Sequence, residues 1–112
     1  MGADAFYVCY GLRWEIVADT DEMAELLEAR RDPRQIAAHR YHIKSWWCQT
    51  VDDGRSVLLI GEMVARFGWE NDHDRRMEGP ALLRTMEETQ EKLRIAGFVD
   101  QPAWHFQFEP DR

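Results

Sequence analysis

The strongest constraint in the sequence is an alternation of side chains near the N-terminus. One set of alternate positions, from residue 6 to residue 16, is apolar throughout: Phe6, Val8, Tyr10, Leu12, Trp14 and Ile16. The positions between them carry Tyr7, Cys9, Gly11, Arg13 and Glu15. A period of two puts successive side chains on opposite faces of a strand, whereas a helix repeats about every 3.6 residues. The sequence therefore predicts a first strand with one apolar face.

A helix in two pieces is predicted after this strand. The first piece is "DTDEMAELLEARR", where Asp19 and Glu22 have the spacing of a capping box. In "DPRQ", Asp32 is suited to the N-cap, Pro33 to the first helical position, and Gln35 has the spacing that completes a capping box. We therefore expect the helix to end, restart at this point, and run to about residue 41 or 42.

The middle of the chain predicts a hairpin, "SWWCQTV" to "SVLLI", with turn residues at 52–54. "LLIGEMVARFG" is either a second hairpin that turns at Gly61 or one long strand bulged there, and we favour the hairpin. A helix follows from Pro80 to Gly97, and its predicted buried stripe is Leu82, Leu83, Met86, Leu93 and Ala96. In the last strand, "AWHFQFE", three aromatic residues share one face: Trp104, Phe106 and Phe108.

This order of elements predicts one α+β domain over residues 1–112. It resembles the ferredoxin-like superfold, a split βαβ arrangement in which two helices lie on one face of an antiparallel sheet. We expect the first and last strands to lie side by side in the middle of the sheet. Trp14 and Phe106 then face the helices and contribute to the core. A superfold by itself implies no function.

Charge and composition exclude some classes of function. Asp and Glu outnumber Lys and Arg by 21 to 14, for a formal net charge of −7. Such a chain is a poor ligand for nucleic acid or an anionic membrane, but it suits a basic protein partner. With two cysteines and no signal-like or membrane-spanning segment, we expect a soluble cytoplasmic protein with free thiols. No cofactor-binding motif is present, and we predict no cofactor.

The stretch "AAHRYHIKSWWCQT" raises the question of a metal site. His39 and His42 are three residues apart, and Cys48 is a candidate third ligand. Spacing fixes no fourth ligand, so we favour a helix end that leads into a strand, and we predict no metal. Because Trp46 and Trp47 are adjacent in a strand, one of them faces away from the helices, and we name Trp47 as a contact candidate.

Three surfaces are candidate binding sites. On the sheet face away from the helices we expect an acid–base residue, an anion-binding arginine and their polar neighbours: Tyr7, Cys9, Arg13, Glu15, His105, Gln107 and Glu109. We favour a solvated or partner-contacting face there over a catalytic one. The loop 70–76 offers carboxylates for a cation and arginines for an anion, although a solvated loop is the simpler interpretation. The acidic surface of the last helix is Glu87, Glu88 and Glu91.

The sequence favours a small acidic, non-enzymatic protein-binding module that regulates a basic partner, as inhibitor or immunity proteins do. A homodimer is compatible with this hypothesis. The alternative is a small-molecule binder or enzyme that uses the helix-free face, with His105 as the acid–base residue and Arg13 holding an anionic group. Whether the protein is an enzyme is left open.

Overall fold

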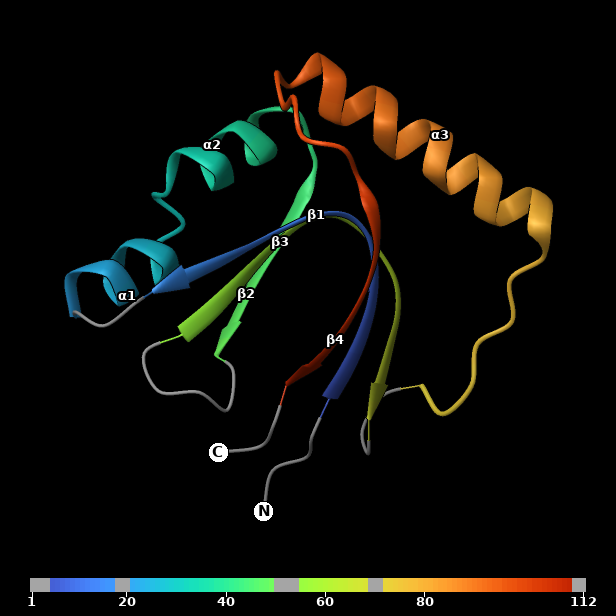
Figure 1. Ribbon diagram of the computed structural model, residues 1–112, viewed down its shortest axis with the longest axis horizontal. Coiled ribbons are helices and arrows are strands. Elements are labelled where there is room, and N and C mark those ends of the chain that lie inside the picture. Colours follow the sequence, from blue (N-terminus) through green and yellow to red (C-terminus); the bar gives the residue numbers. More distant parts are fainter. Residues whose placement is uncertain (1–4, 18–20, 50–54, 69–71, 110–112) are drawn as a thin grey trace.

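The computed structural model describes residues 5–17, 21–49, 55–68 and 72–109. These residues form an antiparallel four-stranded sheet and three helices (Figure 1). The α+β class is therefore confirmed, and the ferredoxin-like assignment stays a prediction. None of the described helices is both long and apolar enough to cross a membrane. The elements in chain order are β1 (Ala5–Val17), α1 (Asp21–Glu28), α2 (Pro33–Arg40), β2 (Lys44–Gln49), β3 (Arg55–Gly68), α3 (Gly79–Ile95) and β4 (Ala103–Glu109).

The strands lie in the order β2-β3-β1-β4. The first and last strands are neighbours, as expected, but β4 is at an edge and β3 takes the central position beside β1. The predicted hairpin at Gly61 is wrong, because β3 continues through this residue and pairs with β1 along its whole length. The irregularity lies further on, at Val64, where the register shifts between the pairs Cys9–Met63 and Val8–Ala65.

A glycine pair allows the two long strands to bend together. Gly11 of β1 is opposite Gly61 of β3, and Figure 1 shows both strands curving through this region. β2 pairs only with the first half of β3, and β4 pairs only with the first half of β1. The bend therefore divides the sheet into two arms, with one edge strand on each.

The main core lies between one face of the sheet and the helices. Leu27 of α1, Ala38 of α2 and Leu93 of α3 pack with buried side chains of β1 and β3 and with the residue just before β2, namely Leu12, Ile16, Leu58, Ile60 and Ile43. All three helices therefore cover the same face, as predicted. Trp14 and Trp47 are half-buried against this core.

Two residues expected in this core lie outside it. Phe106 is on the helix side of the sheet but is 66% exposed, because it lies on an edge strand. Leu83 of α3 is 58% exposed. Thr89 and Leu93 are the buried residues of this helix. The buried stripe of α3 is therefore narrower than the stripe that its apolar residues predict.

A second, smaller cluster fills the opposite face of the sheet, which we call the helix-free face. Cys9, Cys48, Val57 and Leu59 are each at most 5% exposed, and Trp46 packs against them. No helix covers this face among the described elements. Its burial follows from the bend, which turns the two arms of the sheet toward each other.

The helix boundaries follow local rules that the sequence made readable. Asp32 accepts a hydrogen bond from the Arg34 backbone N–H, and the Gln35 side chain accepts one from the Asp32 backbone N–H. This capping box starts α2 as predicted. α3 begins with Pro80 in its first turn. The other predicted capping box includes Asp19, which lies outside the described residues.

Candidate functional site

The predicted polar residues of the helix-free face are brought together, but they bind one another. The strand register places Tyr7, Arg13, Glu15, His105 and Gln107 on this face. Arg13 donates a hydrogen bond from Nε to Gln107 Oε1 at 3.0 Å, and its Nη2 lies 3.5 Å from Glu15 Oε1. Nε2 of His105 lies 3.0 Å from the backbone oxygen of Gly11. These contacts tie β4 to β1 and leave few polar atoms for a ligand.

No carboxylate accompanies His105 as a hydrogen-bond partner in the described part of the chain. Glu109 instead accepts a hydrogen bond from the Tyr7 hydroxyl at 2.8 Å. Burial and this carboxylate raise the pKa of Tyr7 to about 12, so the phenol stays protonated at neutral pH. The arrangement is a structural network that closes the folded sheet, and it does not have the geometry of an acid–base pair.

The two cysteines lie in the apolar cluster of the helix-free face. Burial raises the pKa of Cys9 to about 12 and that of Cys48 to about 11. The Glu109 carboxylate on β4 also raises the pKa of Cys48 on β2. Both thiols are unsuited to nucleophilic chemistry, because thiolates are the reactive form.

The candidate metal ligands are not gathered into one group within the described residues. No three His, Cys, Asp or Glu side chains of that part of the chain lie close enough together to hold a metal ion. His39 and His42 line a cleft beside α2, whereas Cys48 is buried in the helix-free cluster. In the loop 70–76, residues 70 and 71 lie outside the described part. Arg76 forms an ion pair with Glu78 at 3.2 Å.

The two tryptophans of β2 divide between the faces. Trp46 packs on the helix-free cluster, and Trp47 packs against the helix-side core. The residue that faces away from the helices is therefore Trp46, although Trp47 had been named as the contact candidate. Both indoles are half-buried.

The acidic surface of α3 is balanced by cations of the same helix. Glu87, Glu88 and Glu91 are exposed, but α3 also carries Arg84, Lys92 and Arg94. Arg94 forms an ion pair with Glu91, so the charge of that carboxylate is neutralised locally. Steering by the three glutamates together is therefore weaker than their number suggests.

The structure exposes a group of aromatic side chains on the sheet face that the sequence predicts to be apolar. Phe6 of β1 is 37% exposed, and Phe106 and Phe108 of β4 are 66% and 46% exposed. The three are contiguous, because Phe6 pairs with Phe108 and its ring centroid lies 6.4 Å from that of Phe106. We call these three residues, together with Leu83 of α3, the aromatic edge surface.

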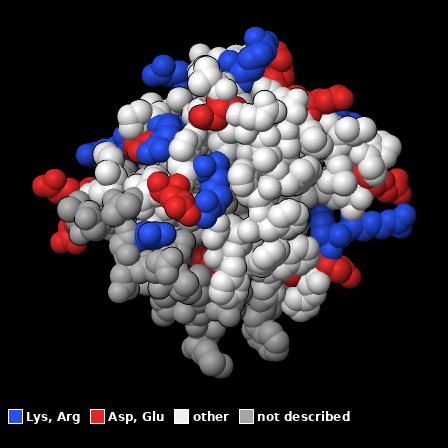
Figure 2. Space-filling model, in the orientation of Figure 1, with Lys and Arg blue, Asp and Glu red and all other residues white. Residues whose placement is uncertain are grey.

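Leu83 is grouped with this surface because the flank of α3 that carries it faces β4. It is two turns before Gln90, so the two share a flank of α3. Gln90 donates a hydrogen bond to the Tyr10 hydroxyl at 2.7 Å, and the Tyr10 ring packs on Trp104 of β4, with ring centroids 5.0 Å apart. This flank therefore faces β4. Figure 2 shows a broad area with few charged side chains over β4, beside α3.

An apolar groove adjoins the aromatic edge surface. It has a volume of about 360 Å³ and is lined by side chains of β1, β3, β4 and the residues around the start of α3. Phe106 and Met77 lie on its wall, and Arg75 is its one charged lining residue among those described. The groove offers a place for an apolar side chain of a partner beside the exposed phenylalanines.

Comparison with known proteins finds no matching family model, no matching curated protein and no matching solved structure. Function is therefore argued from the geometry of the described residues.

Proposed function

We propose that the protein is a non-enzymatic protein-binding module that uses the aromatic edge surface. The observation that carries this proposal is the contiguity of three exposed phenylalanines, two on the edge strand β4 and one on its neighbour β1: Phe106, Phe108 and Phe6. Single exposed apolar residues are ordinary, but a contiguous aromatic group of this kind is typical of interaction sites.

The mode of binding follows from the position of β4. Within the described residues, β4 has a neighbour on one side only, so the backbone groups of its other side have no partner strand. Free edges usually carry charges, prolines or bulges that prevent pairing. β4 presents Phe106 and Phe108 on the helix side, and we propose that an extended segment of the partner adds to this edge. A partner side chain then enters the adjoining apolar groove.

A basic partner is favoured by the distribution of charge. Residues 29–49 contain five of the 14 Lys and Arg but one of the 21 Asp and Glu. The rest of the chain is therefore more acidic than the net charge of −7 indicates. Glu87 is one turn after Leu83 on the same flank of α3, at the rim of the aromatic edge surface. Rim charges act mainly on the association rate.

The structure adds no support to the enzymatic alternative, because its two candidate residues already have partners within the fold. His105 is engaged with the Gly11 backbone and Arg13 with Gln107. The enzymatic alternative therefore stays a prediction. The two free, buried thiols are compatible with the expected cytoplasmic setting.

A comparison of matched variants tests the proposal. Tagged wild-type protein, the double variant Phe106→Asp/Phe108→Asp and the control Val99→Asp are used to capture proteins from a lysate of the source organism. Val99 is 95% exposed and is not part of the aromatic edge surface, so its variant adds a charge elsewhere. Circular dichroism confirms that each variant is folded.

We expect one basic protein in stoichiometric amount with wild type and Val99→Asp, and its loss with the double variant. Glu87→Lys should slow association while dissociation changes little. Equal capture by all variants, or no stoichiometric partner for wild type, would contradict the proposal.

A further inference from the structure

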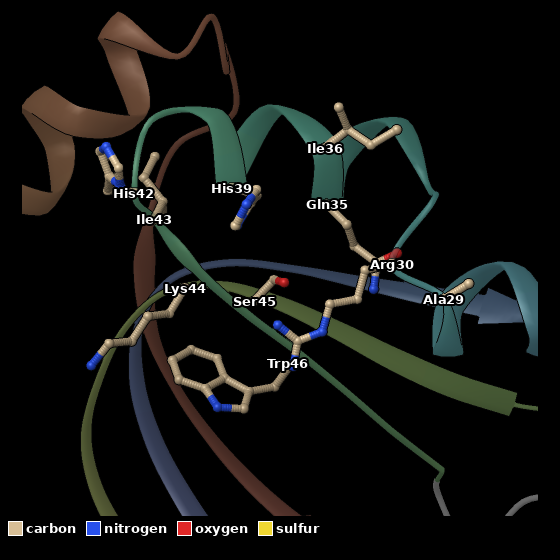
Figure 3. Close-up of a pocket in the computed structure, with 10 residues that line it drawn as sticks. All are labelled: Ala29, Arg30, Gln35, Ile36, His39, His42, Ile43, Lys44, Ser45 and Trp46. Atoms are coloured by element: carbon tan, nitrogen blue, oxygen red, sulfur yellow. The ribbon is translucent and has the colours of Figure 1, made fainter.

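A cleft of about 730 Å³ lies between the ends of α1 and α2 and the edge strand β2. Figure 3 shows the Arg30 side chain reaching from the end of α1 toward Ser45 and Trp46, and the His39 ring pointing from α2 toward β2. Lys44 extends past the Trp46 indole at one end, where His42 also lines the cleft. Its volume is in the range of sites that bind small molecules.

The cleft is cationic in an acidic protein. Its described lining includes Arg30, Lys44 and two histidines, and no carboxylate. An adjoining smaller cavity of about 210 Å³ shares Arg30, Gln35, Ser45 and Trp46 with the cleft and is also lined by Glu28. Arg30 and Lys44 form no ion pair with any described residue. Their charges therefore remain available to a ligand.

The other polar groups around the cleft are already engaged. Asp32 is buried and bound by Arg34, whose Nε and Nη2 donate to its two carboxylate oxygens at 2.8 and 2.9 Å. Gln35 donates to the Leu27 backbone oxygen at 3.1 Å and accepts from the Asp32 backbone. Asp32, the one carboxylate within residues 29–49, is thus neutralised inside the fold and does not compete with a ligand for Arg30.

The backbone under the cleft holds two of its basic residues in an unusual conformation. α1 and α2 each end with a pair of hydrogen bonds typical of a Schellman motif: Arg30 N–H to Leu27 O with Arg31 N–H to Leu26 O, and His42 N–H to His39 O with Ile43 N–H to Ala38 O. In each motif one residue is left-handed, with φ +58° at Arg30 and +59° at His42. Glycine is the usual residue there, because it has no Cβ.

α3 provides the internal comparison. It ends in the same pair of bonds, from the Gly97 and Phe98 N–H groups, and its left-handed residue is Gly97 with φ +94°. Gly97 does not line the cleft. The two helices that end at the cleft therefore carry basic side chains where the third helix has glycine. Backbone strain at non-glycine residues concentrates at functional sites.

We propose that this cleft binds a phosphomonoester that carries a planar ring. The Arg30 guanidinium is a planar fork of donors that matches phosphate oxygens, and Lys44, whose side chain extends past the other side of the Trp46 indole, adds a second positive charge to the cleft. A lining that carries two cations and no carboxylate among its described residues favours a doubly charged phosphate over a singly charged carboxylate. His39 and Ser45 supply further hydrogen-bonding groups, and the Trp46 indole is a flat apolar wall for the ring. This site is separate from the aromatic edge surface and does not depend on it.

Titration calorimetry at low salt tests the ligand class with four probes. We expect adenosine 5′-monophosphate to bind at least tenfold more tightly than inorganic phosphate, adenosine or 2-naphthoate. Backbone amide signals of residues 44–46 should shift on binding. No binding of the nucleotide, or equal binding of adenosine, overturns the proposal. Tighter binding of naphthoate overturns the choice of a phosphate.

Variants at adjacent arginines test the site. Arg30→Gln and Arg31→Gln remove the same charge, but of the two only Arg30 lines the cleft. We expect at least a tenfold loss of affinity for Arg30→Gln and less than a twofold loss for Arg31→Gln. Equal losses would show diffuse attraction by positive charge and overturn the site.

Arg30→Gly separates binding from a structural role. Glycine relieves the left-handed strain, so the melting temperature should rise by about 4 °C while affinity falls at least tenfold. If Arg30 were retained for stability, this variant would melt at a lower temperature. That result, or unchanged affinity, would contradict the proposal.

Discussion

Gly11 of β1 and Gly61 of β3 are directly opposite each other, and neither has room for a Cβ atom. A Cβ on Gly11 would lie 2.1 Å from the Ile60 backbone oxygen, and one on Gly61 would lie 2.2 Å from that of Tyr10. Gly61 also has a φ of +156°, which side chains disfavour. This close approach accompanies the bend that turns the two arms of the sheet toward each other.

Replacing either glycine of this pair should destabilise the fold. Gly11→Ala or Gly61→Ala places a methyl group against backbone that cannot move aside, and we expect a loss of about 3 kcal/mol or more in the free energy of unfolding. Urea denaturation measures the change. Gly79→Ala is the control, since no atom lies within 4 Å of its added Cβ. Equal unfolding midpoints for Gly11→Ala and wild type would refute the role of the pair.

Stability should fall as the pH rises above about 9. The folded state raises the pKa of Cys48 to about 11, and those of Cys9 and Tyr7 to about 12. A group whose folded pKa is raised stabilises the fold below its unfolded pKa, about 8.5 for Cys and 10 for Tyr. That contribution is lost as the pH rises toward the folded value. Urea midpoints between pH 7 and 11 test this.

The variant Cys48→Ala identifies one source of this pH dependence. It removes one of the three groups, so its stability should decline less steeply with pH than that of wild type. The slope of stability against pH is compared, rather than the stability at one pH, because the substitution also changes packing. Parallel curves would show that the Cys48 thiol is not involved.

The thiols should be protected in the native protein. Cys9 is fully buried and Cys48 is 5% exposed, and the raised pKa values keep both protonated at pH 7. We expect reaction with a disulfide reagent such as DTNB to be at least a hundredfold slower in the native protein than in urea. Rapid labelling of either thiol in the native state would contradict the described helix-free cluster.

Removing the Asp32 carboxylate should weaken the fold at neutral pH. Asp32 caps α2 and binds Arg34, and the hydrogen bond from Arg34 lowers its pKa below the usual value. Asp32→Ala should cost about 1–2 kcal/mol at pH 7. A group with a lowered folded pKa stabilises above its unfolded pKa, about 3.9 for Asp, and loses this effect as the pH falls. The deficit of the variant should therefore shrink toward pH 2.5.

An exposed aspartate provides the control for this experiment. Asp100 forms no ion pair with any described residue, so Asp100→Ala should change stability by less than about 0.5 kcal/mol at either pH. A constant deficit of Asp32→Ala across the pH range would mean that packing, rather than charge, is lost.

Much of the candidate site was beyond sequence reasoning, for identifiable reasons. The alternation in the last strand gave the correct face for Phe106, but exposure depends on whether another element covers that face. Tyr7 and His105 were placed on the correct face, yet their use in an internal network depends on the bend at Gly11. One signal was readable and was overlooked: the cations gathered within residues 29–49.

The sequence by itself determined the first and last strands, the broken helix, its capping box and the glycine that ends α3. These features depend on residues within a few positions of one another, where backbone geometry and short-range hydrogen bonds decide. The tertiary structure alone decided that β3 runs through Gly61, that three phenylalanines remain exposed, and that Arg30 and Lys44 line one cleft. Each of these depends on which distant segments meet, and pairing partners and burial are not encoded in any local pattern.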